Sequence, residues 1–156
     1  MFREMRRFKQ QLSEEECAEL LRTVPRGVLS VCGDDGYPYG VPMDFVCADG
    51  KLYFHCAKEG HKLDAILRND KVSFCIMDEG YRDEGDWALR IRSVIVFGRM
   101  RVLEDAEERI TRLRQLGQKY YPDADSVESE MKRDAARAVV LELTPEHITG
   151  KRVHEK

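Results

Sequence analysis

A short basic turn at residues 58–62, with the sequence Lys-Glu-Gly-His-Lys, holds the side chains best suited to bind an anion. It follows an apolar, strand-like segment at residues 52–57 and precedes a helical pattern around residues 61–67. Unpaired backbone N–H groups and the positive end of the helix dipole make a helix start a natural anion site. Flexible cations beside that start favour phosphate, although an ordinary solvated turn is the plainer interpretation. The candidate phosphate ligands are Lys58, Gly60, His61 and Lys62.

His55 is the strongest candidate for a group that acts on a ligand. Side chains alternate between the two faces of a strand, so the segment at residues 52–57 has one face made of Leu52, Phe54 and Cys56. The other face is made of Tyr53, His55 and Ala57. If the first face is core, His55 and Tyr53 point toward a cleft, a partner or solvent. His55 is then either an acid–base group beside a ligand or a histidine satisfied at the surface of a barrel.

Other chemistries find weaker support. The spacing of His55, Cys56 and His61 matches no zinc pattern, and we expect no metal. The cysteines in apolar strands are poor nucleophiles, because apolar surroundings raise the pKa of a thiol. No glycine-rich dinucleotide or Walker-type loop is present. The basic residues do not alternate with aromatic residues, and the net charge is −3, so we expect no nucleic-acid partner.

Length and composition favour one domain over residues 1–156, with an exposed or partner-bound arm at residues 1–12. No apolar run approaches the roughly 20 residues that span a bilayer. The five cysteines form no C-x-x-C pair, and no signal peptide is evident. These features predict a soluble, cytoplasmic protein without a membrane partner.

The elements that must position these residues are short strands with inserted helices. Ser13 with Glu16, and Asp105 with Glu108, are helix-capping signatures. A further short helix is expected from Ser126 to Ala138. Strands are expected at residues 27–32, 41–47, 52–57, 72–77, 93–103 and 139–143, with a bulge at Gly98 and a tail after residue 143. About six closely spaced strands, mostly connected by hairpins, predict an α+β fold built on a small antiparallel barrel.

The order of these features resembles the FMN-binding split-barrel proteins related to pyridoxamine 5'-phosphate oxidase. Within them the chain is most similar to the nitroimidazole-resistance (Nim-type) group. The matching segments are PRGVLSVCGDDGYPYGVPMDFV at residues 25–46 and LYFHCAKEGHKLDAILRNDKVSFCI at residues 52–76. RSVIVFGRMRVLED at residues 92–105 and ITGKR at residues 148–152 complete the set. The segment at residues 52–76 is the most specific.

The resemblance implies a six-stranded antiparallel Greek-key split barrel with flanking helices. It also implies a homodimer with two FMN molecules in clefts between the subunits. The turn at residues 58–62 would hold the FMN phosphate, and His55 would lie beside the flavin as the catalytic residue. The other cofactor-binding positions implied are Pro42, Met43, Asp44, Ala57, Ser93 and Val94.

The implied function is that of an FMN-dependent oxidoreductase, with a nitroreductase as its specific form. NAD(P)H or another donor would reduce the flavin, which would then reduce a small-molecule substrate. Two alternatives stay open: a non-catalytic flavin- or haem-binding protein, and a structural dimer without a cofactor. Split-barrel relatives differ in reaction, so the fold alone does not decide between these functions.

Overall fold

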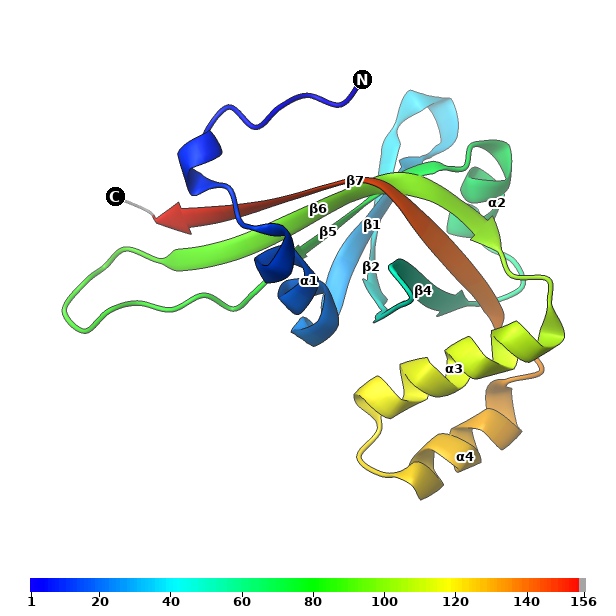
Figure 1. Cartoon of the computed structure of the whole chain (residues 1–156). Coiled ribbons are helices and arrows are strands. Elements are labelled where there is room, and N and C mark those ends of the chain that lie inside the picture. Colours follow the sequence, from blue (N-terminus) through cyan, green and yellow to red (C-terminus); the bar gives the residue numbers. More distant parts are fainter. Residues whose placement is uncertain (155–156) are drawn as a thin grey trace.

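The computed structural model describes residues 1–154, which form one antiparallel sheet of seven strands with four α-helices (Figure 1). The order of the strands in space is β2-β1-β5-β6-β7-β4-β3. This confirms the predicted α+β class and the split-barrel type, with seven strands in place of six. The strands are β1 (Arg26–Cys32), β2 (Pro38–Asp44), β3 (Val46–Ala48), β4 (Lys51–Cys56), β5 (Lys71–Met77), β6 (Arg90–Val102) and β7 (Val139–His154).

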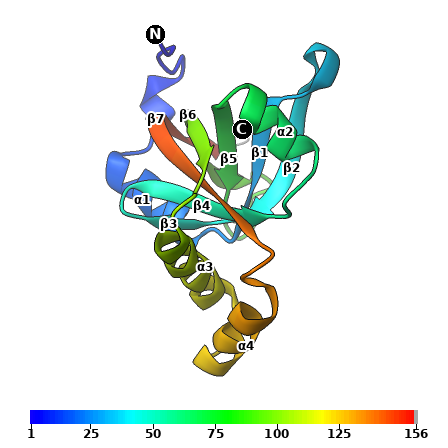
Figure 2. The same cartoon turned by 90° about the vertical axis from the view of Figure 1, so that its right-hand side faces the viewer.

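The two edge strands of the sheet, β2 and β3, are consecutive in the chain and are joined by Phe45. Because β2 ends at Asp44 and β3 begins at Val46, the two edges meet at Phe45, which is completely buried. The sheet is therefore curled (Figure 2). The prediction of one extended run over residues 41–47 was therefore wrong. The backbone leaves one edge at Asp44 and joins the other at Val46, which accounts for the seventh strand.

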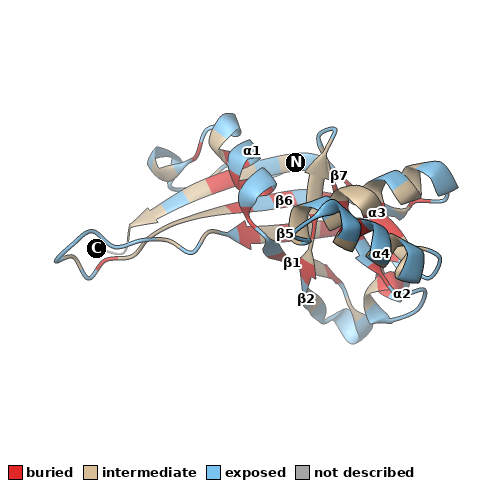
Figure 3. Cartoon of the chain, turned by 90° about the horizontal axis from the view of Figure 1, so that it is seen from below, coloured by how far each residue is buried: buried red, intermediate tan, exposed pale blue. Residues whose placement is uncertain are grey.

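The main core fills the inside of the curled sheet (Figure 3). Alternate residues of β1, β5 and β6 are buried, which is the period-two pattern of a sheet with one covered face. The rings of Phe45 and Phe54 each contact the Phe74 ring edge to face, with centroids 4.9 Å apart. This geometry suits aromatic quadrupoles. The three rings hold the joint at Phe45 against the centre of the barrel.

Strands β6 and β7 form a long ribbon that extends beyond the barrel (Figure 1). The expected tail after residue 143 is wrong, because β7 continues to His154 and pairs with β6 as far as Arg90. The predicted bulge at Gly98 is confirmed by a register shift between Phe97 and Gly98. A Cβ atom at Gly98 would lie 2.2 Å from the carbonyl oxygen of Thr144. Only glycine therefore allows the two backbones to approach this closely.

Local capping signals set three of the helix starts. Ser13 and Glu16 form the predicted capping box, and Asp105 accepts a hydrogen bond from the backbone of Glu108 as its position predicts. The last helix is capped by Asp123 and ends before Ala138, so the predicted start at Ser126 was too late. Helix α2 connects β4 to β5, which are separated in the sheet by β6 and β7. The helices are α1 (Glu14–Thr23), α2 (His61–Arg68), α3 (Ala106–Tyr120) and α4 (Ala124–Asp134).

Helices α3 and α4 pack against each other and project from one side of the barrel (Figures 1 and 2). A second apolar cluster joins α3 to the sheet through Tyr53, Leu103, Leu113, Leu116 and Val140. In α4 only Val127 is buried. Helix α3 is therefore anchored to the barrel, whereas α4 is held mainly by α3.

Residues 1–12 cross the outside of the β6–β7 ribbon. The ring of Phe2 stacks on His147 with centroids 4.7 Å apart, and Leu12 is buried in the main core. A bridge between Gln11 and Lys151 attaches the end of this segment to β7. Within residues 1–154, no helix has both the length and the apolar character needed to cross a membrane.

Candidate functional site

The basic turn lies at the start of α2, as the sequence predicts. Gly60 is the N-cap residue and has a φ of 140°, a value that side chains with a Cβ atom rarely adopt. No side chain among residues 1–154 caps this end of the helix, so its first backbone N–H groups remain available to an anion. Lys62 lies in the first turn, is half-buried, and makes no ion pair with any residue of 1–154. Lys58 is exposed on the preceding turn.

His61 packs against the hairpin formed by β1 and β2. Its ring stacks on Tyr39 with centroids 4.2 Å apart, and its Nε2 atom lies 3.6 Å from a carboxylate oxygen of Asp34. Asp34 also accepts a hydrogen bond of 2.7 Å from Arg68. The side chain of His61 therefore contacts Tyr39 and Asp34, on the side of α2 that faces the β1–β2 hairpin. Its backbone N–H remains in the first turn of the helix.

His55 is exposed on β4, while Leu52, Phe54 and Cys56 are buried in the main core, as the alternation predicts. The expectation that Tyr53 shares an open face with His55 was wrong. Tyr53 is only 1% exposed because α3 covers it, and Arg112 lies 4.3 Å above its ring. Its hydroxyl donates a hydrogen bond to buried Glu142. His55 is thus left facing outward at the end of the region covered by α3.

Two concave regions meet at Asp44 and His55. The first, called here the polar hollow, has a volume of about 360 Å³. It brings together five predicted site residues and adds Arg26, which the sequence analysis did not single out. The polar hollow is lined by Arg26, Pro42, Met43, Asp44, His55 and Lys62.

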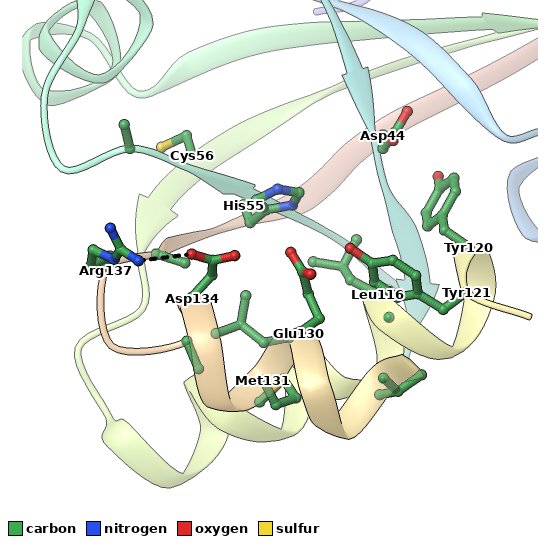
Figure 4. Close-up of a pocket in the computed structure, with 16 residues that line it drawn as sticks. Asp44, His55, Cys56, Leu116, Tyr120, Tyr121, Glu130, Met131, Asp134 and Arg137 are labelled. Atoms are coloured by element: carbon green, nitrogen blue, oxygen red, sulfur yellow. Dashed lines mark hydrogen bonds and ion pairs between the residues drawn. The ribbon is translucent and has the colours of Figure 1, made fainter. Parts of the chain in front are cut away.

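The second region, called here the helical pocket, has a volume of about 410 Å³ and lies between β4 and the α3–α4 pair (Figure 4). Ala57 and Cys56 line its β4 side. Apolar side chains from both helices form most of its wall, and several polar groups lie around its opening. The apolar wall includes Leu113, Leu116, Val127, Met131, Ala135 and Ala138, and the polar groups are Asp44, His55, Tyr120, Tyr121, Glu130, Asp134 and Arg137.

Charges at the junction are arranged in pairs. Arg26 donates a hydrogen bond of 2.7 Å to Asp44, and this bond raises the pKa of the Arg26 guanidinium. On α4, Arg133 donates hydrogen bonds to Glu130 and Asp134. The bond from Arg133 holds the pKa of Asp134 below its usual value, despite some opposing desolvation. The carboxylate of Asp134 is therefore charged at neutral pH.

The backbone at Asp44 is held in place from α3. The hydroxyl of Tyr120 accepts a hydrogen bond of 2.9 Å from the N–H of Phe45 and lies within bonding distance of the carbonyl oxygens of Phe45 and Pro25. The Nζ atom of Lys119 donates to the carbonyls of Val24 and Phe45, each at 2.9 Å. Burial lowers the pKa of Lys119 to about 8. These contacts, called here the α3 clamp, fix the joint that carries Asp44 to the junction of the two regions.

Not all the predicted residues come together. Ser93 lies on β6 opposite Met77 and Lys151, near the same end of the sheet as Arg26 but two strands away. Val94 is completely buried in the core, so its side chain faces away from both concave regions. Within residues 1–154, no three His, Cys, Asp or Glu side chains lie close enough to hold a metal ion.

Sequence reasoning missed the helical contribution to this site. Tyr121, Glu130 and Asp134 carry no motif, and they reach the vicinity of His55 only because α3 and α4 fold back over β4. Arg26 could have been identified from the sequence as a site residue, because it lies opposite Asp44 in the β1–β2 hairpin. Its register with Asp44 follows from the turn between β1 and β2.

Comparisons with known proteins agree with the fold. The family described as pyridoxamine 5'-phosphate oxidase matches residues 13–152. No curated protein matches the chain. Similar solved structures include a candidate 5-nitroimidazole antibiotic resistance protein from Bacteroides thetaiotaomicron, with 20% identity and a TM-score of 0.78 over 92% of this chain and 87% of that chain.

Two other similar structures are flavin proteins. One is an FAD-binding protein from Mesorhizobium loti, with 24% identity and a TM-score of 0.68 over 92% of this chain and 97% of that chain. The other is an FAD and haem binding protein from Mycobacterium smegmatis, with 20% identity and a TM-score of 0.73 over 91% of this chain and 72% of that chain. At these identities the likeness concerns the fold.

Proposed function

Because the chain belongs to the pyridoxamine 5'-phosphate oxidase family, we propose that it is an FMN-dependent oxidoreductase. The observation that carries this proposal is the polar hollow. There the half-buried Lys62, free of ion pairs within residues 1–154, lies at the uncapped start of α2 beside Arg26. Cations at a helix start suit a phosphate. His55 joins this hollow to the larger helical pocket.

The donor set of the polar hollow fits the phosphate end of FMN. Lys62, Arg26 and the first N–H groups of α2 would hold the phosphate, and a Cβ atom at Gly60 would meet nothing within 4 Å, which leaves open space at the turn. Bound flavin would supply the two-electron chemistry. The negative charge of Asp44 opposes an anion, but its hydrogen bond to Arg26 offsets that charge.

His55 is proposed as the catalytic residue. Its imidazole is exposed at the junction of the two concave regions, and no residue of 1–154 forms a hydrogen bond with it. It can therefore hold or release a proton at a ring nitrogen next to a bound substrate. We propose a nitro compound as the substrate class and NAD(P)H or another donor as the source of electrons.

We also propose a homodimer with FMN at the subunit interface. The outer face of the sheet exposes Val28, Ile95 and Phe97 on strands close together in the sheet. Cys75 lies between Val28 and Ile95 in the same cross-strand row. Such a group of exposed apolar side chains is typical of a protein–protein interface. Ser93, near the end of this face, would then border the cofactor, and Val94 would do so through its backbone.

A cytoplasmic location completes the proposal. All five cysteines lie within the described residues and are free thiols. This state suits a reducing compartment.

The first experiment is an absorbance spectrum of the purified protein with mass spectrometry of any released cofactor. Flavin bands with the mass of FMN are expected. Lys62→Ala should weaken FMN binding about tenfold, through loss of a charge-assisted contact to phosphate. Lys71→Ala is the matched control, since Lys71 is an exposed lysine on β5 outside the polar hollow. Equal losses in both variants would refute the phosphate assignment.

A second candidate function is a non-catalytic flavin- or haem-binding protein. It is favoured by the imidazole of His55, which has no hydrogen-bond partner within residues 1–154 and could ligate haem iron as well as move a proton. A Soret band in the purified protein would identify haem, and its loss in His55→Ala would identify the ligand. Flavin without NAD(P)H-driven reduction of any nitro compound would favour a flavin binder. A colourless protein whose melting temperature does not change when FMN is added would favour the third alternative, a structural dimer without a cofactor.

A further inference from the structure

Asp44 and His55 are the two residues that line both the polar hollow and the helical pocket. One supplies a carboxylate and the other an imidazole. The imidazole is the side chain whose charge changes most readily near neutral pH, and a carboxylate beside it favours the charged form. The junction therefore holds two groups that can relate the charge in one region to a proton in the other.

The two groups differ in their present partners. The Nε atom of Arg26 donates a hydrogen bond of 2.7 Å to Asp44, whereas His55 has no hydrogen bond or ion pair with any residue of 1–154. The side chain of Arg26 is 67% exposed, and that of Asp44 is 31% exposed. Because an ion pair with such an exposed partner contributes little to stability, Arg26 can change partner easily. The carboxylate of Asp44 stays at the junction.

Arg26 also lines the polar hollow, together with Lys62 at the uncapped start of α2. A dianion in the hollow therefore competes with Asp44 for the guanidinium. A phosphate is the stronger competitor, since it carries more charge and accepts paired N–H bonds from arginine. The charge of Asp44 already acts on this neighbourhood: burial lowers the pKa of Lys119 to about 8, and Asp44 partly opposes that fall.

We propose that Asp44 couples the binding of an anion in the polar hollow to the protonation of His55. When the anion takes Arg26, the carboxylate of Asp44 loses its compensating charge and accepts a hydrogen bond from a ring N–H of His55. His55 then gains a proton from water and becomes an imidazolium. Asp44 is thus a positioning residue that acts through His55. The coupling rests on the proposed function, which takes the hollow as the phosphate site and His55 as the proton donor.

Other charged and titratable groups also lie around His55. Lys62 contacts the same hollow, so an anion that neutralises it favours the imidazolium directly, without Asp44. On α4, Asp134 is bonded to Arg133 and Arg137 instead of to a cation of the polar hollow. Among the described acidic residues, Asp44 alone is paired with an arginine that lines this hollow. The further titratable groups of the helical pocket are Cys56, Tyr120, Tyr121 and Glu130.

Inorganic sulfate is the probe for this coupling, because it stays a dianion near neutral pH and takes up no proton itself. Isothermal titration of the full chain, freed of any bound flavin, would be run at pH 7 in two buffers of different ionisation enthalpy. The parent protein should take up roughly 0.3–0.5 of a proton per sulfate, as an imidazole that gains a carboxylate partner implies. His55→Gln should abolish this uptake, whereas His61→Gln should keep it.

Two variants separate Asp44 from the direct effect of the anion. Asp44→Asn should bind sulfate at least as tightly as the parent, because a like charge is removed and Arg26 is freed, yet its proton uptake should fall by about half or more. A purely structural role would lower the affinity instead. Asp70→Asn is the matched control, since Asp70 pairs with Arg99 at 2.9 Å outside the hollow. It should leave both quantities unchanged.

Arg26→Gln tests the coupling without any anion. Asp44 then lacks its partner permanently, so the His55 ring at pH 7 should already show, by NMR, the chemical shifts of the sulfate-bound parent. Ring shifts identical to those of the sulfate-free parent would overturn the inference. Circular dichroism of each variant, compared with Asp70→Asn, shows whether its fold is intact.

The coupling and the phosphate assignment fail in different ways. If sulfate does not bind, or binds equally to the parent and to Lys62→Ala, the phosphate assignment is refuted and the coupling falls with it. If sulfate binding depends on Lys62 but the parent takes up no proton, the coupling is refuted and the phosphate assignment stands. Proton uptake as large in Asp44→Asn as in the parent has the same meaning.

Discussion

Removing the hydroxyl of Tyr120 tests whether α3 holds the joint between the two sheet edges. In Tyr120→Phe the ring remains but the hydrogen bonds to the Phe45 backbone are lost. The N–H of Phe45 then has no replacement partner, because Phe45 is completely buried and water does not reach it. An unsatisfied buried donor costs roughly 1–3 kcal/mol.

The other hydrogen bonds around the Tyr120 hydroxyl decide the total loss of stability in Tyr120→Phe. A hydroxyl has one hydrogen, so Tyr120 donates to only one of the two nearby carbonyls at a time. The carbonyl of Phe45 keeps its bond from Lys119, and Pro25 is exposed enough for its carbonyl to accept from water. The donated bond therefore adds about 0.5–1.5 kcal/mol, and the expected loss of unfolding free energy is roughly 1.5–4.5 kcal/mol.

The assay is urea unfolding at neutral pH, followed by circular dichroism, with Tyr121→Phe as the matched control. Tyr121 is the next residue in the chain, but its hydroxyl faces Glu130 rather than the backbone of Phe45. The control should change stability by less than about 0.5 kcal/mol. A similarly small change in Tyr120→Phe, at an unchanged m-value, would refute the interpretation that the α3 clamp secures the joint.

Three further predictions concern pH and packing. Burial lowers the pKa of Lys119 from 10.5 to about 8, so between these pH values the folded protein has lost a proton that the unfolded chain retains. The free energy of unfolding of the parent, relative to that of Lys119→Met, should therefore rise by roughly 1–3 kcal/mol as the pH rises across this window. A difference between the two proteins that does not change with pH, measured by urea unfolding, would contradict this prediction. Burial alone would raise the pKa of Glu142, but hydrogen bonds from Arg101, Lys51 and Tyr53 outweigh it and keep that pKa low. Glu142→Gln should therefore cost roughly 3 kcal/mol at neutral pH, with the cost shrinking as pH falls through the acid range; a cost independent of pH would count against this network. Gly98→Ala places a Cβ atom 2.2 Å from the Thr144 carbonyl oxygen and should cost about 2 kcal/mol or more in thermal melts. Gly40→Ala places a Cβ atom 3.3 Å from the exposed side chain of Val28 and should cost clearly less.

Local signals in the sequence were sufficient where neighbouring residues decide the structure. The capping box of Ser13 and Glu16 and the start of α2 after Gly60 each involve residues a few positions apart. The alternation in β4 correctly assigned Leu52, Phe54 and Cys56 to the core. Such features depend on backbone geometry and side-chain periodicity, which a single sequence reveals.

Features that depend on distant segments could not be predicted in this way. Tyr53 is buried because α3 covers it, and that contact joins residues nearly 60 positions apart. The extension of β7 to His154 depends on pairing with β6, because Thr144 to His154 show only weak apolar alternation on their own. Glu130 and Asp134 line the site for the same reason. In each case the burial or pairing of a residue depends on tertiary packing, which the local sequence pattern does not reveal.

The position of β4 in the sheet has a consequence for how the protein is made. Its two neighbours in the sheet are the three-residue strand β3 and β7, and β7 comes after all the other described strands in the sequence. During synthesis on the ribosome, the hairpin of β1 and β2 can pair before the rest has emerged, but the strand that bears His55 pairs with β7 only after β7 has been made. The junction of the two concave regions is therefore assembled late in folding.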